Sequence, residues 1–97
     1  MIIYKVELVD MMGYANNEKY FFKLVPARKY LTELRNERKK LHGENYIKES
    51  ERENPVLMNR KDDVYSMSIG FMYQCMEEIE EWDEAEEIII IKKIKVN

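Results

Sequence analysis

The sequence predicts a single α+β domain: a small antiparallel or mixed three-stranded sheet, in the chain order β-β-α-α-β, with two helices packed on one face. Three observations support this. Apolar residues alternate near the N-terminus, they recur with a helical period in the middle, and a β-branched run lies near the C-terminus. The chain has 97 residues, which suffices for one hydrophobic core but not for two domains.

The N-terminal part of the chain predicts a β-hairpin. Apolar side chains fall at every second position from Ile2 to Leu8, which is typical of a half-buried strand over residues 1–9. Gly13 and the asparagines after it supply turn chemistry. The aromatic-rich segment that follows predicts a second strand over residues 19–25.

A first helix is expected at residues 27–41. Pro26 suits the first turn of a helix, and Leu31 and Leu34 fall on one face at 3.6 residues per turn. Gly43 can adopt the left-handed conformation that closes a helix. Residues 42–62 show no clear period and are rich in charge, which predicts a long surface loop.

The segment from residue 63 to residue 85 is compatible with two structures. Its apolar residues, from Val64 to Trp82, keep to one side of a helical projection, and this favours one long helix over 63–85. Its first part also alternates as a strand would, which leaves open a strand over 64–70 followed by a helix over 71–85.

Four consecutive isoleucines begin the last predicted element, a strand over residues 87–96. A β-branched run of this kind is typical of a strand that is covered on both faces, so we expect this strand to lie in the centre of the sheet.

Composition indicates the cellular compartment of the protein and the distribution of its charge. The single Cys75 cannot form an intramolecular disulfide, and no apolar run is long enough to cross a membrane, so we expect a cytoplasmic protein without a membrane anchor. The net charge of −3 is unevenly distributed, with +4 in residues 1–61 and −7 in residues 62–97.

The acidic run of residues 77–87, with eight acids in eleven residues, is the strongest functional signal. In one interpretation it is a solvated helix face that pairs loosely with the basic first helix. In the other it presents carboxylates and an aromatic anchor to a basic protein surface. The second interpretation assigns partner binding to Glu77, Glu78, Glu81, Trp82 and Glu84.

A basic stripe on the first helix supports an alternative function. Arg28, Arg35 and Lys39 are spaced to lie along one side of that helix, where they could contact phosphates of DNA or RNA. The sequence pI of about 5.3 argues against direct nucleic-acid binding. The stripe can instead complement the acidic run within the chain, or bind a partner.

Apolar residues predicted on both faces of the sheet suggest a further interface. Either the 44–61 loop folds over the second face, or that face forms a homodimer or assembly contact. The predicted residues of this contact are Ile3, Phe21, Ile89 and Ile91.

No pattern in the sequence indicates an enzyme. His42 is the sole histidine, and its place at a predicted helix end favours a structural role. No phosphate-binding loop, nucleophile motif or Cys/His cluster is present, so we expect no catalytic residues, no metal and no cofactor.

These features favour a non-enzymatic protein–protein interaction module, in which an acidic helix docks on a basic surface of a larger protein. In general profile, a short acidic α+β chain rich in Tyr and Glu, it resembles the inhibitors that phages make against host defence systems, anti-CRISPR proteins included. The acidic run itself suggests nucleic-acid mimicry, because regularly spaced carboxylates could bind a basic surface that normally holds nucleic-acid phosphates. The alternatives are a dimeric nucleic-acid-binding regulator and a structural assembly subunit.

Overall fold

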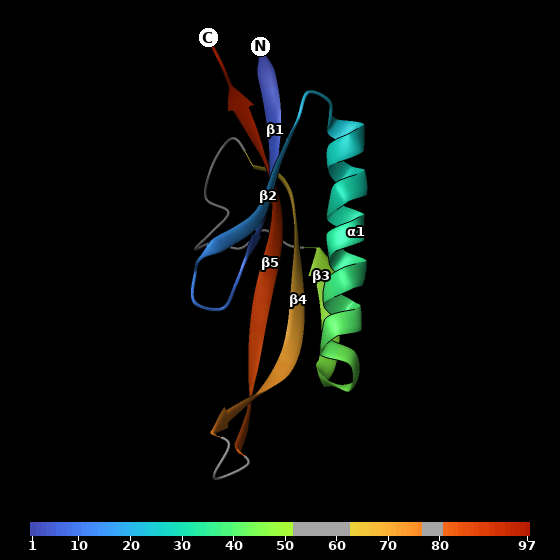
Figure 1. Ribbon diagram of the computed structural model, residues 1–97, viewed down its shortest axis with the longest axis vertical. Coiled ribbons are helices and arrows are strands. Elements are labelled where there is room, and N and C mark those ends of the chain that lie inside the picture. The colour runs from blue at the N-terminus through green and yellow to red at the C-terminus, as the bar shows by residue number, and fades with distance from the viewer. Residues whose placement is uncertain (52–62, 77–80) are drawn as a thin grey trace.

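The computed structural model describes residues 1–51, 63–76 and 81–97, and shows there a five-stranded antiparallel sheet with one α-helix on one face (Figure 1). The prediction of a three-stranded sheet with two helices is therefore wrong. The strands are β1 (Ile2–Val9), β2 (Ala15–Phe21), β3 (Tyr46–Glu51), β4 (Asp63–Met76) and β5 (Glu81–Lys95); the helices are α1 (Leu24–His42) and the 3-10 turn η1 (Gly43–Asn45).

The sheet has the order β2-β1-β5-β4-β3, so the C-terminal strand lies in the centre. Its isoleucine run explains this position, because alternate side chains of a central strand must be buried on both faces. Ile89 lies between Leu8 of β1 and Met67 of β4, whereas the neighbouring Ile88 lies between Val9 and Ser68.

The helix predicted over 63–85 does not form in the described residues, which belong to β4 and β5. This segment follows the period of two that is typical of a strand: Tyr65, Met67 and Ile69 point to one face, and the small Ser66 and Ser68 point to the other. Backbone pairing between β4 and β5 explains why a strand forms here. A helix here would leave one edge of the apolar β5 without backbone partners, and such buried groups are costly.

The other predicted elements are found with altered boundaries. The first hairpin forms, with its second strand at Ala15–Phe21 rather than 19–25, and the helix predicted over 27–41 extends over Leu24–His42. The predicted 42–62 loop instead begins with η1 and the edge strand β3, and residues 52–62 lie outside the described part.

Two apolar clusters lie on opposite faces of the sheet. The larger one lies under α1, on what we call the helix face, and the opposite side is the far face. The far-face cluster is small and comprises Val9, Ile88 and Ile90. The helix-face cluster comprises Val6, Leu8, Ala27, Leu31, Leu34, Ile69, Ile89 and Ile91.

Candidate functional site: an acidic hairpin arm and a methionine turn

The acidic run forms part of a two-stranded hairpin that projects past the rest of the sheet (Figure 1). The pairing of β3 with β4 ends at Phe71, and the pairing of β1 with β5 ends at Ile88. Beyond these points β4 and β5 pair only with each other in the described residues, as at Gln74 opposite Trp82. We call residues 72–76 and 81–86 the arm.

The arm presents an aromatic side chain among carboxylates. Trp82 is 48% exposed, and the neighbouring Glu81, Asp83 and Glu84 are exposed as well. By the alternation of a strand, Trp82 and Glu84 lie on the far face, away from α1. A half-exposed indole beside charged groups has the composition of an interface anchor.

A turn between β1 and β2, residues 10–14, carries further exposed apolar groups. The side chains of Met11 and Met12 are 49% and 73% exposed. Asp10 fixes the turn, since its carboxylate Oδ1 accepts hydrogen bonds from the backbone N–H groups of Met12 and Tyr14, at 2.9 and 3.0 Å. Gly13 adopts a φ of 86°, which favours glycine. We call this segment the methionine turn.

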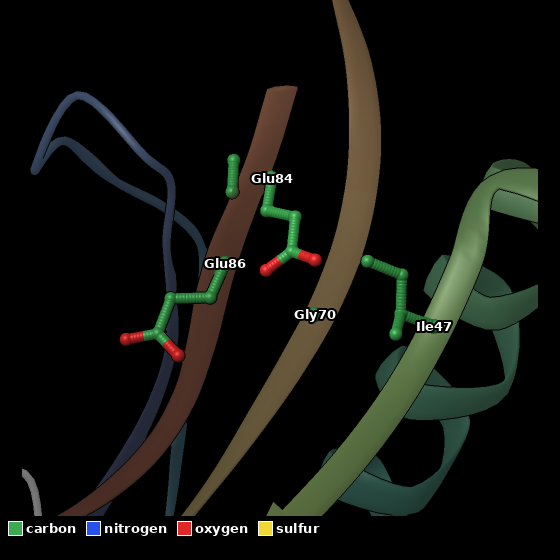
Figure 2. Close-up of a pocket in the computed structure, with 5 residues that line it drawn as sticks. Ile47, Gly70, Glu84 and Glu86 are labelled. Carbon is green, nitrogen blue, oxygen red and sulfur yellow. The ribbon is translucent and has the colours of Figure 1, made fainter. Parts of the chain in front are cut away.

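Two hollows adjoin each other across the arm. One, of about 350 Å³, lies between the methionine turn and the arm and is lined by Met11, Met12, Tyr73, Glu84, Ala85 and Glu86. The second, of about 230 Å³, is lined by Ile47, Gly70, Glu84, Ala85 and Glu86, and Figure 2 shows Ile47 of β3 on one side of it and the glutamates on the other. Gly70 has no side chain, which leaves space between these two walls.

The hollows therefore combine carboxylates with flexible apolar side chains. Glu84 and Glu86 belong to both, and Ser68 donates a hydrogen bond of 2.8 Å to Glu86 from the far face. Methionine side chains adapt their shape to a partner, and carboxylates attract a cation. A lysine- or arginine-bearing segment of another protein fits this arrangement.

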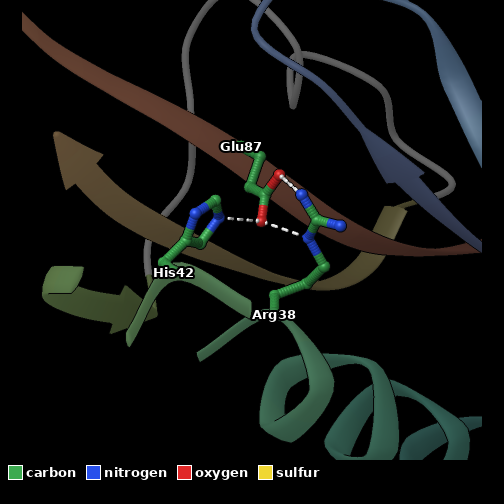
Figure 3. Close-up of polar contacts among 3 residues, drawn as sticks. All are labelled: Arg38, His42 and Glu87. Carbon is green, nitrogen blue, oxygen red and sulfur yellow. Dashed lines mark hydrogen bonds and ion pairs between the residues drawn. The ribbon is translucent and has the colours of Figure 1, made fainter. Parts of the chain in front are cut away.

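A buried ion pair fixes the base of the arm to the helix. Arg38 donates two hydrogen bonds to the Glu87 carboxylate, of 2.6 and 2.8 Å, and His42 Nε2 lies 2.9 Å from Glu87 Oε1 (Figure 3). The His42 ring also stacks on Phe71, with centroids 3.9 Å apart. Glu87, 2% exposed, is thus held rigidly against the end of α1.

The structure places three of the five predicted partner-binding residues on the arm. Glu81, Trp82 and Glu84 lie there, but on a strand rather than on a helix. Glu77 and Glu78 lie outside the described residues. One interpretation expected the acidic run to pair with the basic first helix, and Glu87, at the base of the arm, forms such an ion pair with Arg38.

The predicted basic stripe is divided. Arg28 and Arg35 line a groove between α1 and β4, together with Thr32. Lys39 does not line that groove, and its Nζ lies 5.0 Å from the centroid of the Tyr46 ring instead.

The four residues predicted for an oligomer face do not lie on one surface. Ile89 and Ile91 are 0% exposed beneath α1, because they pair with Leu8 and Val6 on the helix face. Phe21 packs against the same cluster and contacts Tyr30, with ring centroids 5.7 Å apart. Only Ile3 belongs to the far face, where Ile88 and Ile90 take the place expected for the other isoleucines.

Sequence reasoning missed the contribution of the methionine turn and of Glu86. The signal for the turn was present, since two methionines directly before a turn glycine are poorly placed for a core. Glu86 could not be separated from its acidic neighbours without the register of β5. Cys75, which falls within the helix predicted over 63–85, is instead exposed on the arm.

Comparison with known proteins gave no relative from which a function could be transferred. No protein-family profile, no curated protein and no solved structure matches this chain. Within the described residues, no three or more His, Cys, Asp or Glu side chains gather as a metal ion requires, and no helix is long and apolar enough to cross a membrane.

Proposed function

We propose that this protein is a non-enzymatic interaction module that docks its arm and methionine turn onto a basic surface of a larger protein. The single observation that carries the proposal is the half-exposed Trp82, set among carboxylates and two residues along β5 from Glu84, which lines the hollow of Met11 and Met12. An aromatic anchor contributes binding energy, and the surrounding charge steers association and selects a cationic partner.

The proposed partner surface is one that also holds nucleic-acid phosphates. The arm offers carboxylates at regular strand spacing on a narrow hairpin, which is the charge pattern that such a surface attracts. The protein then acts as an inhibitor, because nucleic acid and the arm compete for the same cations.

An affinity capture with matched variants tests the proposal. The bait is the full chain, incubated with nuclease-treated lysate and washed at low and high salt, beside an arm variant E81Q/E84Q. The control is E33Q/E37Q, which makes the same charge change at exposed positions on α1. We expect one basic protein that the wild type and the control retain and that the arm variant or high salt releases.

The recovered partner then allows a quantitative test. W82A should weaken binding by about thirtyfold, which corresponds to the roughly 2 kcal/mol of a hot-spot aromatic, and a short DNA duplex should displace the protein from its partner. Equal capture by the arm variant and the control, or capture that resists high salt, would contradict the proposal.

A further inference from the structure

A groove on the helix face has the opposite character to the arm. It lies between α1 and the first half of β4 and has a volume of about 480 Å³, within the range of roughly 300–1,000 Å³ that ligand pockets occupy. Its lining among the described residues is Arg28, Leu31, Thr32, Arg35, Tyr65 and Met67.

The groove joins cationic and hydroxyl groups to an apolar floor. Arg28 and Arg35 are seven residues apart on α1, which places them about 10 Å apart along the helix axis. The described part of the chain places no carboxylate within ion-pair distance of Arg28. Tyr65 and Met67 of β4 supply the floor. This combination suits a ligand with an apolar ring flanked by two or more anionic groups.

The arm of this same protein carries such a ligand. The exposed indole of Trp82 shares the far face with Glu84 and Glu86, which follow it at alternate positions of β5. A chain cannot fill its own groove in this way, because Trp82 and Glu84 lie on the far face whereas the groove lies on the helix face.

We propose that the groove is the binding site for the arm of a second copy of this chain. The inference rests on the proposed function of the arm as a docking element. Each chain has one arm and one groove, so two chains related by a two-fold axis make two identical contacts and leave neither element unused. Self-association then competes with partner docking for the same arm.

Charge reversal tests this contact in both directions. R28E/R35E places two acids in the groove and keeps the acidic arm, whereas E81K/E84K keeps the arginines of the groove and places two lysines beside Trp82 on the arm. Each variant alone should be monomeric, with its dimer Kd raised by at least about a hundredfold through like-charge contact. Mixed in equal amounts, the two should form a heterodimer, because both of its contacts are again complementary.

Two measurements report the result on the intact protein. Light scattering gives the mass, which for the wild type should be that of two chains at low salt and one chain at high salt. Trp82 is the only tryptophan, so its emission should shift to shorter wavelength with rising wild-type concentration as the ring leaves water. The control K29E/K40E, altered at two exposed lysines of α1, should still dimerise.

The contradicting outcomes are distinct from those of the proposed function. A wild type that stays monomeric at all concentrations, or a dimer that neither charge-reversed variant disturbs, overturns the inference. So does a single-stranded oligonucleotide that binds through Arg28 and Arg35 to a monomeric wild type, which assigns the groove to phosphates. Retained capture of a basic partner in those cases leaves the proposed function standing, because R28E/R35E does not change the arm.

Discussion

At the scale of single residues, the most consequential charge on the far face is Glu7. Its carboxylate forms ion pairs with Lys92 and with Lys5, the latter at 3.3 Å. Burial alone would raise the pKa of Glu7, but the hydrogen bond and charge of Lys92, followed by those of Lys5, outweigh it and lower that pKa. Burial likewise opposes the charge of Lys5, and Glu7 outweighs it and raises the pKa of Lys5.

These shifts predict how stability depends on pH. The lowered pKa of Glu7 contributes stability above its ordinary value of 4.5, and this is lost as the pH falls through the folded value. The raised pKa of Lys5 contributes stability below 10.5, and this is lost as the pH rises through the folded value. E7Q removes both contributions and should lower the unfolding free energy by on the order of 2 kcal/mol between these limits.

Urea denaturation across the pH range checks the prediction. The difference between the wild type and E7Q should be largest at neutral pH and should shrink below pH 4.5 and above pH 10.5. The control E18Q removes only the surface partner of Lys5, at 3.6 Å, and should change stability by less than about 1 kcal/mol. A difference that does not vary with pH would show that Glu7 acts through packing alone.

Glu87 shows where residue-level reasoning from sequence stops. It is one of eight acids in eleven residues, and nothing local distinguishes it from Glu86. Only the register of β5 places Glu87 under α1 and leaves Glu86 on the far face. The sequence could therefore predict an acidic surface around Trp82, but not that one member of the run is an internal ion-pair partner.

At the scale of elements, the methionine turn depends on one side chain. Asp10 accepts two backbone hydrogen bonds that hold Met11 and Met12 beside the arm. D10A should lower the unfolding free energy by about 1–2 kcal/mol and should also weaken partner docking, because the turn is no longer held in place.

Chemical denaturation and a binding titration, run on the same preparations, test the role of this turn. D10N keeps one acceptor oxygen, so it should lose less than half as much stability as D10A. If D10A binds the partner as tightly as the wild type does, the methionine turn is not part of the docking surface.

The elements that sequence predicted best are those with a single dominant period. The alternation from Ile2 to Leu8, the leucine spacing of α1 and the isoleucine run each allow one structure. The segment that begins β4 satisfies two periods, so local pattern could not decide. A long-range interaction selects the strand: the backbone groups along the second edge of β5 need hydrogen-bond partners, and β4 supplies them.

At the scale of the whole molecule, opposite charges are separated in space as well as in sequence. The protein extends over 53 × 24 × 19 Å, with the arm at one end (Figure 1). Trp82 and Glu84 of the arm lie on the far face, whereas the groove of Arg28 and Arg35 lies on the helix face. The charge asymmetry was countable from the sequence. The sequence could not predict that Trp82 and the groove of Arg28 and Arg35 lie on opposite faces, because this arrangement depends on the pairing of β4 with β5.

The same architecture predicts a gradient of local stability along β5. Residues from Ile88 to Ile91 pair with strands on both sides, whereas Trp82 and Glu84 pair only with β4 in the described residues. The amides of the isoleucine run should therefore exchange with solvent only through global unfolding, which costs at least about 5 kcal/mol. Arm amides should exchange by local opening, at least about a thousandfold faster.

Hydrogen exchange on the isolated protein, followed residue by residue, measures this gradient. The comparison is best made at low protein concentration and high salt, where neither self-association nor partner binding protects the arm. At high concentration and low salt, protection of the arm amides should rise while that of Ile88 to Ile91 stays the same. Equal protection along the whole strand in the dilute sample would contradict the predicted gradient, because the arm would then be as stable as the sheet.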